Sequence, residues 1–110
     1  MSKRLERHLH LLRVLARGDK KLRDSLIRNS DESLVHCLCE CALNTLKGNV
    51  PLTTSQKKKL AVHKKSIREL AVKHPSLKHK KKLLVQRGGA FLPLLLAPII
   101  GALINRILPS

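Results

Sequence analysis

The chain is 110 residues long and carries 23 Lys and Arg residues against 7 Asp and Glu residues, a formal net charge of +16. Such an excess favours an anionic partner, because like charges repel one another in a compact protein. There is no Trp or Tyr and one Phe, which excludes the aromatic platforms that stack single strands or RNA loops. The expected contact is Coulomb attraction to a phosphate backbone, which is largely independent of base sequence and weakens with salt.

Helical spacing of apolar residues begins near the N-terminus. Leu5, Leu9, Leu12 and Leu15 recur at steps of three and four residues. This period places them on one side of a helix. The pattern predicts a helix over residues 3–17.

Capping residues mark the next two helices. Asp19 is a good N-cap for a short helix over about 20–28, and Ser30 for a helix that runs to Lys47. Both residue types accept hydrogen bonds from the free N–H groups of a first helical turn. Gly48 then favours the end of this second helix, because glycine readily adopts the left-handed conformation found after a helix C-terminus.

A fourth helix is predicted over about 54–73. Thr53 followed by Gln56 fits a capping box, in which the two residues cap each other's backbone N–H groups. Pro75 ends the helix, because proline lacks the N–H donor and clashes with the preceding turn. The sequence therefore predicts an all-α protein, with a small bundle of about four helices at residues 1–74.

Two further segments are expected after the bundle. Residues 75–87 are a basic linker, extended or helical only on a partner, and residues 88–110 are an apolar Gly/Pro/Leu-rich tail. The Gly88-Gly89 junction favours a detachable tail, although a buried core element is an alternative. From Gly88 to Ile104 the tail has 17 uncharged residues, whereas a membrane-spanning helix needs about 20 apolar ones.

The positive charge is concentrated before this tail. Residues 56–87 hold 12 Lys and Arg residues and one acid, Glu69, whereas an ordinary solvated surface mixes both signs. We expect double-stranded nucleic acid to bind there, and the run Lys78–Lys82 also fits a nuclear localisation signal. The candidate phosphate contacts are Lys57, Lys58, Lys59, Lys64, Lys65, Arg68, Lys78, Lys80, Lys81, Lys82 and Arg87.

The apolar tail suggests a second class of function. A basic segment that leads into an apolar one suits anionic lipid surfaces. The alternatives are a tail that packs on a partner protein or on the chain's own bundle. The side chains expected to serve membrane contact or assembly are Phe91, Leu92, Leu94, Leu95, Leu96, Ile99 and Ile100.

The segment HCLCEC suggests a metal site. Zinc takes four N or S ligands in a tetrahedron, and His36 precedes Cys37, Cys39 and Cys41. On a helix, however, Cys39 points away from the other two thiols, and no second cysteine pair follows. We interpret the cysteines as small buried apolar residues in a reducing compartment and expect no metal.

No catalytic arrangement is found. The sequence has no Gly-rich phosphate loop and no pair of carboxylates in an apolar context, and a Cys/His pair occurs only as neighbours in a helix. We expect a protein that is not an enzyme and has no cofactor. A sequence-specific regulator would need a helix with Asn, Gln and Arg for base edges, and none is recognised.

The segment QRGGAFLPLLLAPIIGA, residues 86–102, resembles the pX family of adenoviral core protein precursors, from which the peptide mu is released. In that family too, a basic region runs into Arg-Gly-Gly and an apolar tail. pX-like proteins of adintoviruses and Maverick/Polinton elements share this order, and the stretch CLCECALNTLKGNVPLT is similar to proteins of such elements.

The resemblance implies a protein of the virion core and host nucleus that condenses double-stranded DNA. It also implies that a viral cysteine protease cuts after Gly89, in the pair Gly88-Gly89. Other core or capsid proteins, and a membrane contacted through the tail, are the further partners to expect.

Overall fold

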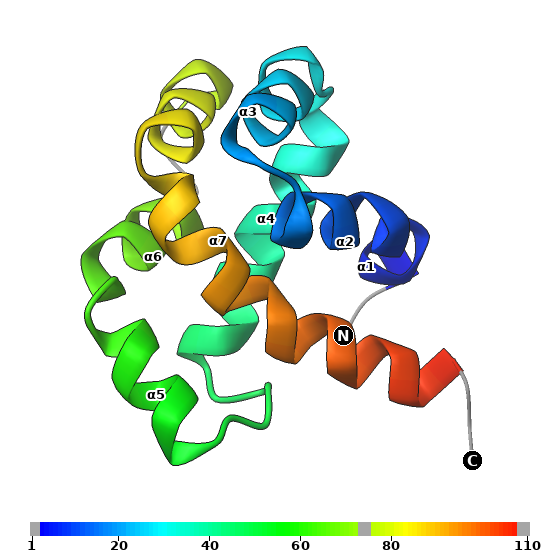
Figure 1. Ribbon diagram of the computed structural model, residues 1–110, viewed down its shortest axis with the longest axis vertical. Coiled ribbons are helices and arrows are strands. Elements are labelled where there is room, and N and C mark those ends of the chain that lie inside the picture. The colour runs from blue at the N-terminus through cyan, green and yellow to red at the C-terminus, as the bar shows by residue number, and fades with distance from the viewer. Residues whose placement is uncertain (1–2, 73–75, 108–110) are drawn as a thin grey trace.

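A computed structural model describes residues 3–72 and 76–107, with side chains up to residue 105, as an all-helical protein (Figure 1). The predicted all-α class is thus confirmed, and no strand occurs in the described part. The helices are α1 (Lys3–Arg7), α2 (Leu9–Arg17), α3 (Lys20–Asn29), α4 (Glu32–Leu46), α5 (Thr54–Ala61), α6 (Lys64–Ala71) and α7 (Leu77–Ile107).

The described residues form seven helices, whereas about four were predicted. Two of the predicted helices are each divided in two. The helix expected over 3–17 is interrupted at His8, and backbone hydrogen bonds from His8 to Arg4 (3.1 Å) and from Leu12 to His8 (2.9 Å) span the interruption. The helix expected over 54–73 is interrupted at Val62-His63. There the His63 N–H bonds the Leu60 carbonyl three residues back at 3.0 Å, a tighter turn than an α-helix makes.

Most of the predicted caps are present. The Asp19 carboxylate accepts a hydrogen bond from the Leu22 N–H at 2.9 Å. Thr53 and Gln56 form the capping box, with hydrogen bonds of 3.1 and 2.9 Å. The prediction of Ser30 as the N-cap of α4 is wrong.

Asp31 caps α4 by accepting from the Leu34 N–H at 3.1 Å. Ser30 closes α3 instead, because its hydroxyl donates to the Ile27 carbonyl at 2.7 Å. The two neighbouring residues therefore serve different helices, a division that only the position of the α3–α4 turn decides.

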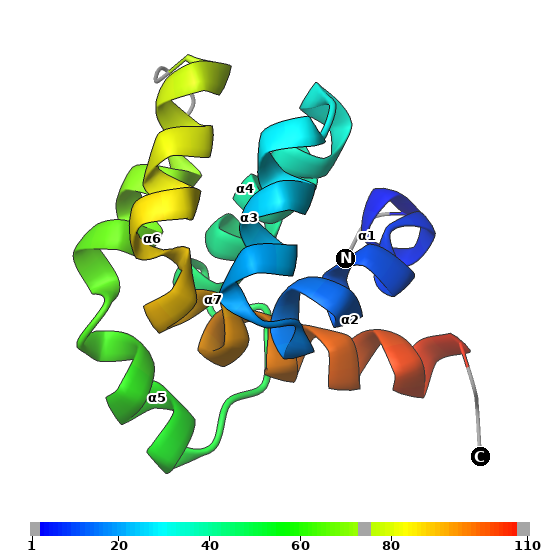
Figure 2. The ribbon, with the colours of Figure 1, turned by 45° about the horizontal axis from the view of Figure 1, so that its top comes forward.

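The expected separation of a basic linker at 75–87 from an apolar tail at 88–110 is not what the structure has. One helix, α7, runs from Leu77 in the first segment to Ile107 in the second and packs against helices α2 to α6. Figures 1 and 2 show α7 running across the molecule with the other helices gathered around it. The Cα radius of gyration is 12.9 Å, close to the roughly 13 Å of a single 100-residue domain.

The apolar half of α7 forms the centre of the core. Side chains at helical spacing along it are completely buried, and they join buried residues from the other helices in one cluster. Burial of each large apolar side chain contributes about 1.5–3 kcal/mol. The α7 side chains with no exposed surface are Leu84, Phe91, Leu92, Leu95, Leu96, Ile99 and Leu103.

Pro93 and Pro98 lie inside α7 without ending it. Each proline removes one helical hydrogen bond and normally bends the helix in the preceding turn. In both views α7 bends where its colour passes from yellow to orange. The bend keeps the apolar side of the helix on the core on both sides of it.

By length and composition, α7 would also be able to cross a membrane. Its segment Leu77–Asn105 contains an 18-residue window with a mean hydropathy of 1.8, and 44% of that window is buried inside the protein. A core helix of a water-soluble protein has the same composition, so this property alone does not assign a membrane role.

Candidate nucleic-acid interface

Most of the predicted phosphate contacts are exposed on three neighbouring helices. α5, α6 and the first turns of α7 lie on the same side of the molecule in both views (Figures 1 and 2). We call their exposed cations the basic surface. Its members are Lys57, Lys58, Lys59, Lys64, Lys65, Arg68, Lys78 and Lys82.

Lys81 and Arg87 have partners within the protein. The Lys81 ammonium donates to the carbonyls of Ser30 (2.6 Å) and Arg28 (3.2 Å). It thus ties α7 to the negative end of the α3 dipole. Arg87 lies 4.0 Å from the Glu69 carboxylate, with 52% of its side chain exposed, so its ion pair is weak and solvent-screened.

Lys80 does not fit the role of a phosphate contact. The residue is only 6% exposed, and its ammonium donates to the Cys39 sulfur at 3.1 Å. Lys80 faces α4 because it lies in the first turns of the helix α7. In the extended linker that the sequence predicts, it would lie in solvent.

Replacing Lys80 by methionine is expected to leave the melting temperature unchanged or higher. Replacement of a buried charge by an apolar side chain of similar length removes a desolvation cost. The variant Lys82→Met is the matched control, because Lys82 is exposed two residues along the same helix. In DNA titrations at several salt concentrations, the salt slope should fall by about 0.9 for Lys82→Met only. An equal fall for Lys80→Met would show that Lys80 reaches the DNA.

Sequence reasoning did not include a second group of exposed cations among the phosphate contacts. They were overlooked because acids are interspersed with them in the first half of the chain, and a local count of the basic residues alone would have found them. The group lies on α1, α2 and α3 and at the C-cap of α4, and its members are Lys3, Arg4, Arg7, Arg13, Arg17, Lys21, Arg28 and Lys47.

Sequence reasoning also missed Arg23, which is only 8% exposed. Its position four residues before the buried Ile27 places it on the inward side of α3. This four-residue spacing from Ile27 is the sequence signal that could have indicated the burial of Arg23. A buried arginine within a strongly basic protein needs an explanation, since charged side chains are rarely buried unless paired.

The cysteines are largely buried, as predicted. Cys37 and Cys41 have no exposed surface, and Cys39 is half-buried beside Lys80. A hydrogen bond with Cys37, together with burial, raises the pKa of the Cys41 thiol, which keeps it protonated and apolar. Within residues 3–72 and 76–105, no three His, Cys, Asp or Glu side chains are grouped so that they would hold a metal ion.

The residues assigned to membrane contact or assembly lie in or against the core. Phe91, Leu92, Leu95, Leu96 and Ile99 are completely buried. Leu94 and Ile100 are partly buried and pack against the same cluster. In this fold the set offers no continuous apolar surface to a membrane.

The expected protease site is inside a helix. Gly88 is buried, and a Cβ atom there would lie 2.9 Å from the Leu92 side chain. Proteolytic nicking concentrates at exposed loop tips. A cut after Gly89 therefore requires α7 to unfold locally.

Comparison of the chain with protein-family models, with curated proteins and with solved structures gives no match. The resemblance to the pX family therefore rests on the sequence features alone.

Proposed function

We propose that the protein binds double-stranded DNA through phosphate contacts, with little base preference, and condenses it. The observation that carries this proposal is the basic surface. Its cations are exposed on adjacent helices, and the only acid in the same stretch of sequence, Glu69, lies near Arg87. Coulomb attraction to closely spaced phosphates follows from this arrangement.

The aromatic residues support a backbone contact over base stacking. Phe91 is the only Phe, Trp or Tyr residue in the sequence, and it is completely buried. Proteins that bind single strands stack bases on exposed aromatic rings. A duplex, which presents phosphates and keeps its bases stacked inside, matches the available surface better.

Condensation requires that one molecule contact two stretches of DNA. The helices α1 and α2, which carry exposed cations, lie on the opposite side of the molecule from α5 and α6 in both views (Figures 1 and 2). Two charged sides allow one protein to bridge two duplexes. On the resemblance to pX, we place this activity in a virion core and in the host nucleus, with other core or capsid proteins as neighbours.

The membrane-active or scaffold-anchoring alternative depends on α7 as a possible spanning helix. In this fold, membrane insertion would first have to remove α7 from the core. Residues such as Phe91, Leu95 and Ile99 would leave completely buried positions, and the other helices would lose the surface they pack on. DNA binding needs no such rearrangement, which is why we favour it.

A titration of two unrelated duplexes at several salt concentrations tests the proposed function. We expect similar affinities for both duplexes, and a logarithm of the binding constant that falls by roughly 0.9 per phosphate neutralised against the logarithm of salt concentration. Light scattering under the same conditions reports condensation. Binding that ignores salt, or that strongly prefers one duplex, would refute the proposal.

A further inference from the structure

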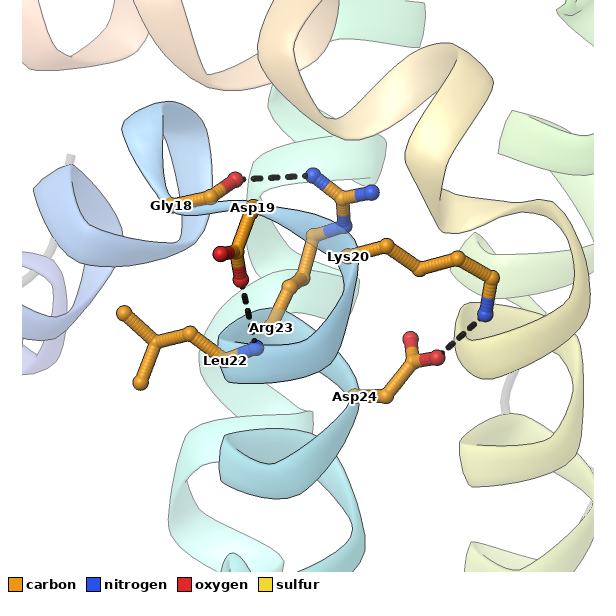
Figure 3. A network of polar contacts seen from close by, with 6 residues as sticks. All are labelled: Gly18, Asp19, Lys20, Leu22, Arg23 and Asp24. Atoms are coloured by element: carbon orange, nitrogen blue, oxygen red, sulfur yellow. Dashed lines mark hydrogen bonds and ion pairs between the residues drawn. The ribbon is translucent and has the colours of Figure 1, made fainter.

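Arg23 is a buried cation, and no salt bridge with a carboxylate is found for it among the described residues. Its Nη1 donates to the Gly18 carbonyl at 3.2 Å, and its Nε is buried and has no hydrogen-bond partner within the described part of the chain. Figure 3 shows the guanidinium extending from α3 beyond the α2–α3 turn, with this single bond drawn to it. The two nearest acids in sequence are engaged elsewhere: Asp19 caps α3, and Asp24 pairs with Lys20.

This arrangement is unfavourable unless an anion completes it. A buried charge is normally paired, because removal from water costs several kcal/mol that attraction to an opposite charge offsets. A guanidinium has five N–H donors in a planar fork that fits phosphate oxygens. One carbonyl leaves most of that capacity unused.

A cleft beside Arg23 provides room for an anion. The cleft has a volume of about 290 Å³ and lies between α3, the start of α6 and α7. Basic and polar side chains line it together with the apolar residues Val85, Ala90 and Phe91, and no Asp or Glu is among the described lining residues. The cations are Lys20, Arg23 and Arg87, and the polar residues include His63, Ser66 and Gln86.

Gly89 allows the guanidinium to approach α7 closely. A Cβ atom at this position would lie 2.7 Å from Arg23 Nη2, too close for the two atoms to coexist without movement. Gly89 thus forms part of the wall of the cleft.

We propose that this cleft binds one phosphate group, with Arg23 as its main ligand and with Lys20 and Arg87 contributing charge. Resting on the proposed function, the phosphate belongs to the backbone of double-stranded DNA. His63 and Ser66 line the cleft on the same chain segment as Lys64 and Lys65, so a duplex on the basic surface passes its entrance. The cleft then fixes the position of one phosphate, whereas the exposed lysines only attract the backbone.

Inorganic phosphate tests the site without DNA. At constant ionic strength, replacing chloride with phosphate at ten times its Kd should raise the melting temperature of the intact protein by roughly 5 °C. Arg23→Gln should abolish this rise, and Lys21→Gln should keep it, because Lys21 is exposed on the same helix and does not line the cleft. If Arg23→Gln does not fold, Gly89→Ala serves instead, since its methyl group displaces the guanidinium. If phosphate still raises the melting temperature after the guanidinium has been removed or displaced, the proposed phosphate site is wrong.

Duplex titrations identify the source of the phosphate. Arg23→Gln should lower the salt slope of DNA binding by about 0.9. If the intact protein binds DNA and Arg23→Gln retains its full slope, this inference is wrong and the proposed function stands. If phosphate stabilises the protein while DNA does not bind, the site takes a free phosphate and the proposed function is wrong.

Discussion

Replacing Phe91 by alanine is expected to lower the free energy of unfolding by about 3–5 kcal/mol. Phe91 is completely buried at the middle of α7, and the smaller side chain loses its transfer free energy and leaves a cavity. Proteins of this size are stable by only about 5–15 kcal/mol. The variant would therefore lose a large part of its free energy of unfolding.

Urea denaturation followed by circular dichroism measures this effect, and Val62→Ala is the control. Val62 is 80% exposed, so removal of its methyl groups should change the free energy of unfolding by less than about 0.5 kcal/mol. A cost below 1 kcal/mol for Phe91→Ala would mean that α7 is not docked in solution. The detachable tail, and with it the membrane alternative, would then be favoured.

Neutralising the six cations of α5 and α6 is expected to remove most of the DNA affinity. The variant carries glutamine in place of Lys57, Lys58, Lys59, Lys64, Lys65 and Arg68. If each cation neutralises one phosphate, the salt slope falls by about 5, and proteins with this many contacts lose about 10³-fold or more in affinity between 50 and 200 mM salt. Fluorescence anisotropy with a labelled duplex at several salt concentrations measures both quantities.

A second variant with the same loss of charge separates surface position from net charge. It carries glutamine at Lys3, Arg4, Arg7, Arg13, Arg17 and Lys21, all exposed on α1, α2 and α3. We expect it to retain most of the salt slope on a short duplex that only one side of the protein can contact. Equal losses in the two variants would show that binding follows net charge and that the basic surface is not the interface.

Local sequence signals were sufficient for the helical class and for most of the helix boundaries. Asp19 and the Thr53–Gln56 pair cap the helices that they predict. Leu5, Leu12 and Leu15 lie in the core as their spacing indicates. These features depend on residues within a few positions of one another, so they can be recognised without knowledge of the fold.

The C-terminal part was misjudged because its local and tertiary preferences conflict. Gly88, Gly89 and the two prolines disfavour a helix, by about 1 kcal/mol for a glycine and about 3 kcal/mol for a proline. The buried positions from Phe91 to Leu103 nevertheless repeat at helical spacing. Packing of that side against α2 to α6 outweighs the local cost, and this gain becomes visible only when the other helices are in place.

The sequence by itself determined that the protein is helical, strongly basic and without a stacking aromatic surface. Only the tertiary structure decided which basic residues face solvent. Lys80 and Arg23 are buried because α7 continues as a helix across the core and brings Cys39 and Gly89 beside them. Charge is a property of composition, whereas exposure and pairing depend on contacts between residues far apart in the chain. The candidate phosphate cleft, formed by α3, α6 and α7, exists for that reason.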